Sequence, residues 1–194
     1  MRSLLLLLAL CVPMISLAQI QKGKTFVSGD FNIINQRNES AHKTSQLNLN
    51  LSAGYLGTNN VAIGGSLGYL SSTTDVRGAS TIMHINDLEL GAFVRRYFLL
   101  DENLYVYAEG QVYAACQKQF QDDHGIRSMK STNPAFGADL TPTAVYFVGK
   151  KVALQASIGK IHFDHRDEGG GWKANVFSTS FGLRALRVGA SIYF

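Results

Sequence analysis

The residues that could do chemistry are a few charged side chains on segments that are otherwise nearly uncharged. These segments alternate between apolar and polar residues, and a period of two places alternate side chains on one face of a β-sheet. If that face is enclosed, its charges must pair, because burying an unpaired charge is costly. We therefore predict an interior network of ion pairs formed by Asp30, Glu89, Arg95, Glu109, Asp139, Arg184 and Arg187.

One pair within this set is defined more sharply than the others. Asp30 and Arg187 lie at similar depth on the first and last alternating segments, which must meet if the sheet closes. We predict that their carboxylate and guanidinium groups are in direct contact, as in an ion pair. The functional alternative is that the enclosed charges form a gate or a proton path.

Metal binding is a second possible chemistry, because the chain has five histidines near the expected loops. His162-x-Asp164-His165 is one dense group, and Asp122-Asp123-His124 could join it. Neither has the fixed ligand spacing that identifies a metal site. We expect solvent-facing loop histidines, with no metal and no other cofactor.

Eight alternating segments would position these side chains. The clearest is 44–55, in which Leu and Ala alternate with Gln, Asn and Ser. Short turns and longer polar loops connect the segments in alternation, which is the plan of small membrane barrels. The sequence predicts an all-β fold, an eight-stranded antiparallel up-and-down transmembrane β-barrel. The expected strands are 24–35, 44–55, 61–71, 82–98, 104–120, 135–148, 151–163 and 174–194.

Two positions interrupt the expected pattern. Pro142 lies inside a predicted strand although it has no backbone N–H to donate. The apolar parity also reverses between Ala185 and Leu186. We expect a β-bulge at each place.

The polar face distinguishes a membrane barrel from a soluble one. A surface in water would carry Lys and Glu, but the strands over 44–71 carry Gln, Asn, Ser, Gly and Ala. The polar face therefore suits the interior of a narrow barrel, and the aliphatic face suits lipid. Aromatic residues should ring the two membrane edges: Tyr55, Tyr97, Phe98, Tyr105, Tyr146 and Phe194 at the short-turn edge, and Tyr69, Phe120, Phe136, Phe163 and Trp172 at the loop edge.

The N-terminal segment predicts export. Arg2 precedes an apolar run that ends on Ser-Leu-Ala, which indicates a signal peptide over 1–18 and a barrel domain over 19–194. Lipidation at Cys11 is the alternative, but Leu10 is bulky where a lipoprotein signal needs a small residue. Only Cys116 would remain after cleavage, so no internal disulfide is expected. The basic residues are scattered, which argues against nucleic-acid binding.

The last segment carries the one local motif of the chain. Arg187-x-Gly189-x-x-Ile192-x-Phe194 resembles the β-signal that outer-membrane proteins present to the barrel-assembly machinery. As a pattern of strands and loops, the mature chain resembles the small eight-stranded outer-membrane proteins of the OmpA-like, OmpX-like and OmpW-like porin-family barrels. The resemblance implies localisation in the outer membrane, contact with outer-membrane lipid, and a monomer.

The expected function is a non-enzymatic structural or surface-interaction role. The predicted strands 82–98 and 104–120 exceed the roughly ten residues that cross a membrane, so their upper ends, with the outer loops, could meet a surface partner. One alternative is a narrow porin-like passage for small or apolar solutes. The other is a lipid A-modifying enzyme, although no histidine is followed two positions later by the Ser that a deacylase-like site requires. We expect no catalytic residues.

Overall fold

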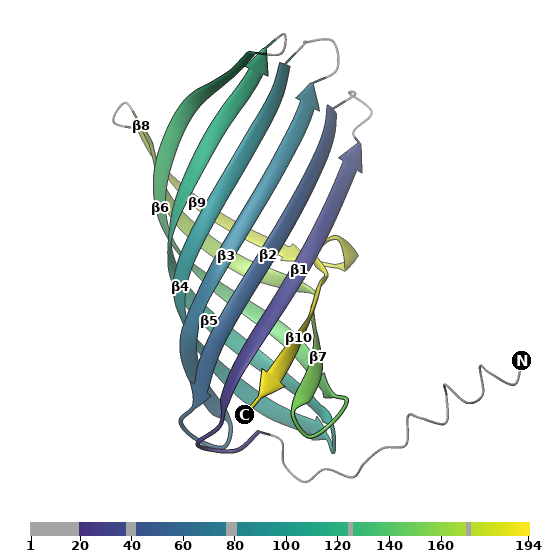
Figure 1. Cartoon of the computed structure of the whole chain (residues 1–194). Coiled ribbons are helices and arrows are strands. Elements are labelled where there is room, and N and C mark those ends of the chain that lie inside the picture. The colour runs from purple at the N-terminus through teal and green to yellow at the C-terminus, as the bar shows by residue number, and fades with distance from the viewer. Residues whose placement is uncertain (1–19, 38–41, 77–80, 124–125, 170–171) are drawn as a thin grey trace, which may run out of the picture.

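The protein is a single antiparallel sheet rolled into a tilted barrel (Figure 1). The computed structural model describes residues 20–37, 42–76, 81–123, 126–169 and 172–194. The predicted signal peptide, 1–18, lies outside these residues. Within the described ranges, no helix is long and apolar enough to cross a membrane. The strands are β1 (Thr25–Arg37), β2 (His42–Leu56), β3 (Val61–Val76), β4 (Thr81–Asp101), β5 (Leu104–Asp123), β6 (Ile126–Phe147), β7 (Val152–Ser157), β8 (Gly159–Gly169), β9 (Trp172–Phe181) and β10 (Arg187–Tyr193).

These ten segments form a ring of eight strands, which confirms the predicted fold. β7 and β8 are two halves of one strand, because both pair with β6. β9 and β10 are likewise two halves of the last strand, separated by the 3-10 turn η1 (Leu183–Ala185). Each strand pairs antiparallel with its neighbours, and β10 pairs with β1 to close the ring.

The strands reach further into the expected loops than the sequence pattern indicates. β6 begins at Ile126 and remains paired with β5 up to Asp123, so most of the loop expected over 121–133 is strand. The loop expected over 164–173 is also mostly strand, because β8 runs to Gly169 and β9 begins at Trp172. Polar residues fit these positions because the strand ends stand above the apolar layer, where neither face requires apolar side chains.

The bulge expected at Pro142 is absent, since this residue is in regular register with Ala108 of β5. On its other side, β6 pairs with β8 up to Leu140 and with β7 from Thr143 onward. Pro142 therefore lies where β6 changes partner and where no ladder bond on that side needs an N–H. The register shift between β5 and β6 occurs instead between Gln119 and Phe120.

The break expected near Ala185 is present, but it is not a bulge. Gly182 has a φ of 117°, and the chain then makes the 3-10 turn η1 before β10 begins. A positive φ of this size suits Gly, because it has no Cβ. A second break, which the sequence analysis missed, separates β7 from β8 at Gly159, whose φ is 156°.

The two faces of the sheet have the predicted chemistry. Large aliphatic side chains point outward, including Leu51, which is 59% exposed, and Leu90, which is 69% exposed. Seven of the predicted edge aromatics also point outward: Tyr55, Tyr69, Phe98, Phe136, Tyr146, Phe163 and Phe194. Tyr97 and Tyr105 are exceptions: they are only 2% and 7% exposed and lie inside the barrel. Their odd parity, shared with Arg95, places them on the inner face of β4 and β5.

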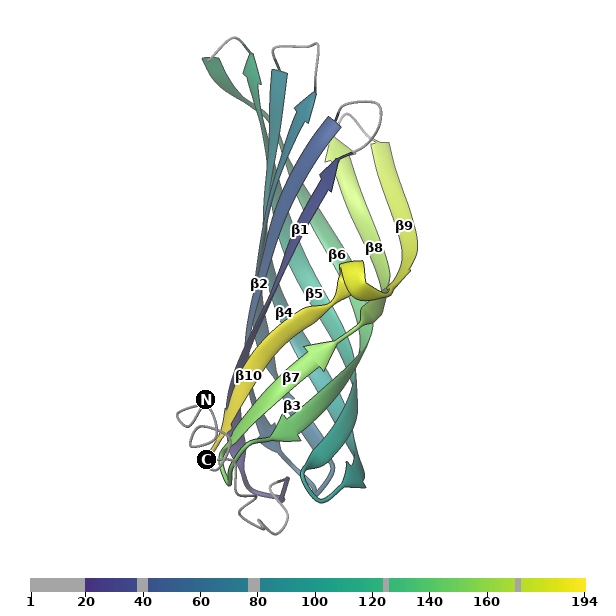
Figure 2. The same ribbon diagram turned by 90° about the vertical axis from the view of Figure 1, so that its right-hand side faces the viewer.

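The ring closes over only part of its height. β1 pairs with β2 along its whole length but with β10 only from Phe26 to Phe31. Above that point the last strand continues as β9, and among the described residues β9 pairs with β8 alone. Figure 2 shows β10 between β1 and β7 and the turn of η1 that leads away from β1 toward β9. The barrel therefore has a closed lower part and a seam in its upper part.

Candidate functional site

The closed lower part of the lumen is organised around Arg95 of β4, one of the most deeply buried side chains in the described residues. Its guanidinium forms an ion pair with Glu109, which faces it in register on β5. It also donates hydrogen bonds to the hydroxyls of Ser52, at 2.8 Å, and Ser28, at 3.3 Å. The charge is thus paired and hydrogen-bonded, as a buried charge requires.

Aromatic rings enclose the same guanidinium. Its central carbon lies 4.8, 4.5 and 4.8 Å from the ring centroids of Phe26, Phe93 and Tyr107, within the range of cation–π attraction. We call Arg95, Glu109 and this ring cluster the lumen seal. The buried apolar cluster to which these rings belong comprises Ile20, Phe26, Leu56, Ala62, Phe93, Tyr97, Tyr105, Tyr107, Val145, Phe147, Ala153 and Tyr193.

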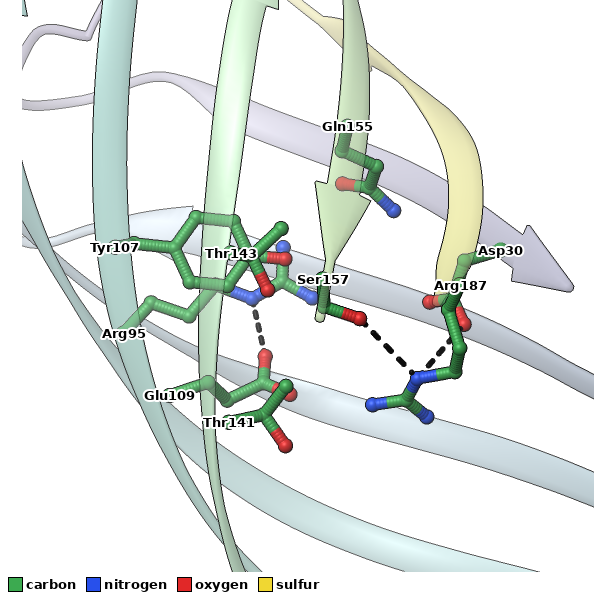
Figure 3. Close-up of a pocket in the computed structure, with 9 residues that line it drawn as sticks. All are labelled: Asp30, Arg95, Tyr107, Glu109, Thr141, Thr143, Gln155, Ser157 and Arg187. Atoms are coloured by element: carbon green, nitrogen blue, oxygen red, sulfur yellow. Dashed lines mark hydrogen bonds and ion pairs between the residues drawn. The ribbon is translucent and has the colours of Figure 1, made fainter. Parts of the chain in front are cut away.

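The predicted contact between Asp30 and Arg187 is present beside the seal (Figure 3). Arg187 Nε lies 3.7 Å from Asp30 Oδ1 and 3.4 Å from the hydroxyl of Ser157. These side chains and the ion pair of the seal line a cavity of only about 10 Å³. That volume holds about one water molecule, so the space between these side chains is nearly filled.

A second group of charges fills the upper lumen. Asp139 of β6 accepts from the ammonium of Lys160 at 2.9 Å and contacts His162 Nδ1 at 2.6 Å. The other ring nitrogen of His162 lies 3.7 Å from Asp164, which also pairs with Arg166 at 2.6 Å. These partners of the two carboxylates all come from β8, so one strand supplies most of the upper charges.

The predicted interior charges therefore form two groups rather than one network. Arg95, Glu109, Asp30 and Arg187 surround the seal, whereas Asp139 belongs to the upper group. Glu89 of β4 lies against Gly68 of β3, where a side chain on the glycine would approach its carboxylate to 3.0 Å. The remaining predicted member is Arg184, whose side chain lies outside the described part of the structure.

The residue pattern did not predict the lumen-facing residues of β8. It assigned one continuous strand over 151–163 and a loop after it, so His162 and Asp164 were expected at or beyond its end. The break at Gly159 moves the inward positions from odd to even numbers, as the outward Leu154 and Phe163 show. The change of apolar positions from even numbers before Gly159 to odd numbers after it was the feature of the sequence that could have revealed this break.

We expected the histidines to face solvent from loops, but the three whose side chains the structure describes lie on strands. His162 lies in the lumen, His165 contacts Asn175 of β9, and His84 bridges Thr73 and Asp122 across three strands. Where the structure describes the chain, no group of three or more His, Cys, Asp or Glu side chains is placed to hold a metal ion. The side chain of His42 and all of His124 lie outside the described residues.

A larger cavity opens at the seam between β1–β2 and β8–β9. Its volume is about 440 Å³, in the range of small-molecule pockets. We call it the seam cavity; its lining includes Gln36, Asn48, Lys160, Thr179, Phe181 and Arg187. Arg187 thus lies between the seal below and the seam cavity above.

The residues of the proposed assembly signal lie on or just after β10. Ile192 and Phe194 point outward and are 46% and 60% exposed, so they belong to the lipid-facing surface. Gly189 packs tightly against β1: a Cβ there would lie 2.1 Å from the backbone oxygen of Gly29. The glycine of the motif is therefore required by the packing of the closing strands.

A ring of tilted antiparallel strands with an aliphatic outside and a charged, sealed inside defines a β-barrel of the outer-membrane class. Residues 3–184 match the family described as "Outer membrane protein beta-barrel domain". The chain belongs to this family, and the protein is located in the outer membrane of a Gram-negative-type envelope. A comparison with curated proteins gave no match.

Solved structures share the fold at low sequence identity. Neisserial surface protein A (NspA) is 16% identical, with a TM-score of 0.50, and the match covers 89% of this chain and 100% of that one. A major outer membrane protein from Thermus thermophilus is 12% identical, with a TM-score of 0.52 and coverage of 88% and 99%. At these identities the likeness concerns the fold alone.

Proposed function

We propose that this barrel is a non-enzymatic, non-conducting membrane protein with a structural or surface-interaction role. The observation that carries the proposal is the lumen seal. An ion crossing the barrel would have to displace Arg95 from its carboxylate, its two serine partners and three aromatic rings. A ring of eight strands leaves little interior space beyond that filled by side chains.

The outer end of the barrel supports the surface-interaction part of the proposal. β4, β5 and β6 have 21, 20 and 22 residues, about twice the length that crosses the apolar layer. Their upper ends rise above the loop ends of the neighbouring strands in Figure 1. Such a projecting, hydrogen-bonded wall can present polar side chains to a partner outside the cell at little entropic cost.

We further propose that the protein is a monomer and that its aliphatic face contacts outer-membrane lipid. The outward side chains of β2, β4 and β5, including Leu51, Leu90 and Val112, form the surface that lipid chains would cover. The tail over 187–194 would be read by the barrel-assembly machinery during insertion. The outward Ile192 and Phe194 and the tight fit of Gly189 against β1 support this assignment.

Planar-bilayer recording tests the absence of conduction. The refolded mature protein should insert without discrete, reproducible current steps, whereas a porin inserted under the same conditions gives them. Regular steps with a fixed conductance would overturn the non-conducting role. They would favour the alternative, a narrow passage for small or apolar solutes, which the 440 Å³ seam cavity above the seal supports.

Lipid analysis tests the absence of enzymatic activity. Lipid A from cells that express the protein should have the same mass spectrum as lipid A from cells that carry the empty vector. The loss or gain of an acyl chain, dependent on expression of the folded barrel, would contradict the proposal and would identify a lipid-modifying enzyme. The conduction test is independent of this result, so each part of the proposal can fail alone.

A further inference from the structure

The seam places an opening at the level of the outer lipid leaflet. A tilted strand needs about 9–11 residues to cross the apolar layer. The ladder between β1 and β10 covers Phe26–Phe31, and one side-chain hydrogen bond, from Asn32 to the carbonyl of Leu186 at 2.6 Å, lies just above it. The seam therefore begins about halfway through that layer and continues upward. Figure 2 shows β1 and β9 rising above the turn of η1, and among the described strands these two are not paired with each other.

Backbone groups along this opening need partners. β9 pairs only with β8, so its other edge has no strand beside it among the described residues. Unpaired N–H and C=O groups facing hydrocarbon each cost several kcal/mol, roughly the cost of a lost hydrogen bond in an apolar medium. An occupant with hydrogen-bonding groups at this height would satisfy them.

The seam cavity has a charged end and amide walls. Lys160 and Arg187 line it. Each also contacts a carboxylate outside the lining, Asp139 at 2.9 Å and Asp30 at 3.7 Å, but none of the described lining residues is itself acidic. Within the described part of the chain, the hydrogen bond and the ion contact of Arg187 both use Nε, which leaves its terminal nitrogens for a ligand. Gln46 and Asn48 form an ordered amide row, with Gln46 donating to Asn48 at 3.2 Å. Cations beside amides fit an anionic group that also carries hydroxyl or ester oxygens.

The mouth of the cavity is apolar. Phe181, which lines the cavity, is 61% exposed, and Leu183 of η1 is 86% exposed. Ile33 of β1 is 61% exposed on the opposite side of the seam. A hydrocarbon chain lying between these side chains would remain in the bilayer, while a polar group attached to it reached the cations.

We propose that the seam cavity binds the head group of an anionic membrane amphiphile that enters sideways between β1 and β9. The charged group contacts Lys160 and Arg187, its neutral oxygens contact the amide row, and its acyl chain stays in the outer leaflet across Phe181 and Leu183. The lumen seal lies directly below, so the ligand is held in the cavity and does not pass into the periplasm.

Native mass spectrometry of the folded mature protein tests this binding, with phosphatidylglycerol and phosphatidylcholine of identical acyl chains as probes. One phosphatidylglycerol should be retained per barrel with a preference of roughly tenfold, which corresponds to about 1.4 kcal/mol. Glycerol phosphate without acyl chains should not displace it, since the apolar mouth would contribute nothing to its binding. Equal retention of the two lipids would overturn the proposal.

Variants locate the binding. Lys160→Gln should abolish the preference for phosphatidylglycerol, and Ser180→Trp, which fills the cavity, should lower the retention of both lipids. Lys43→Gln, at an exposed position on β2, removes the same charge outside the cavity and should change nothing. If Lys43→Gln and Lys160→Gln have equal effects, the lipid binds to surface charge and the proposal is wrong. Each variant must first show the heat-dependent gel shift of a folded barrel.

A cross-link tests whether the seam is open. Ile34 and Thr179 line the cavity from opposite walls, and they can be changed to cysteine in a Cys116→Ser background. A disulfide needs Cα atoms within about 7 Å, so an open seam should leave both thiols free in lipid bilayers. Rapid, complete disulfide formation would show that β1 and β9 close on each other, and it would exclude the ligand.

Discussion

The ion pair between Arg95 and Glu109 should be coupled far more strongly than any surface pair in this protein. Their side chains are only 2% and 10% exposed, and removal of one partner from a buried pair costs about 3–5 kcal/mol. The perturbation is a double-mutant cycle of Arg95→Met, Glu109→Gln and the combination of both, which preserves approximate side-chain volume while removing each charge.

The two single variants should lower the free energy of unfolding by different amounts, because the charged side chain that remains has different neighbours in each. In Glu109→Gln the guanidinium keeps Ser28, Ser52 and the three rings, so the free energy of unfolding should fall by about 3 kcal/mol. Arg95→Met also loses the cation–π contacts, each worth about 0.5–2 kcal/mol, and leaves a carboxylate unpaired. The loss of unfolding free energy in Arg95→Met should therefore be near the upper end of the 3–5 kcal/mol range, at about 5 kcal/mol.

The double variant leaves no unpaired charge in the seal. Its loss should therefore be smaller than the sum of the two single losses, with a coupling energy of about 2–3 kcal/mol, which is the upper part of the range for contacting residues. The assay is reversible urea unfolding in lipid vesicles, followed by circular dichroism and by the gel shift of the folded barrel.

The exposed pair Arg127–Asp122 provides the matched control. Its atoms are 3.5 Å apart and Arg127 is 54% exposed, so the same cycle, with Arg127→Gln and Asp122→Asn, should give a coupling energy of about 0–1 kcal/mol. If the losses in the Arg95 and Glu109 variants add to within about 0.5 kcal/mol, the two residues act independently. The account of the seal as one charged unit would then be wrong.

Three further predictions concern the backbone and the surface. Gly189→Ala places a Cβ 2.1 Å from a backbone oxygen of β1 and should abolish the folded gel band, whereas Gly110→Ala, with no atom within 4 Å of the added carbon, should retain it. Pro142→Ala should change the urea midpoint little, but Ala144→Pro, in register with strands on both sides, should prevent folding. Cys116 is exposed and near the outer end of β5, so a membrane-impermeant maleimide should label it on intact cells; labelling only after permeabilisation would reverse the assigned orientation.

The sequence predicted the eight-stranded ring well because lipid and lumen impose opposite chemistry on alternate residues. Over 47–55 every second side chain is apolar, and this segment is strand throughout. The upper ends were less predictable, since both faces of a strand above the membrane can be polar. That is why the sequence analysis assigned Ile126 and the residues after it to a loop.

The candidate site was predicted in its lower half and only in part in its upper half, where Asp139 was expected but its partners on β8 were not. Parity alone placed Asp30, Arg95 and Glu109 inside, and the contact of Asp30 with Arg187 followed from strand order. The upper charges on β8 were hidden by the reversal of parity at Gly159. The seam could not be read from local pattern, because it depends on how far the first and last strands pair across the length of the chain.

The shortness of the β1–β10 junction makes the barrel mechanically uneven. The β7–β10 ladder is equally short, but the β8–β9 ladder continues it, whereas the β1–β10 ladder joins the two ends of the chain over Phe26–Phe31 with no turn to link them. Under heat or force the ring should rupture here first, giving a curved open sheet with intact hairpins. The rate of that rupture would set the lifetime of the protein, so changes that strengthen this junction should prolong survival more than equal gains elsewhere in the ring.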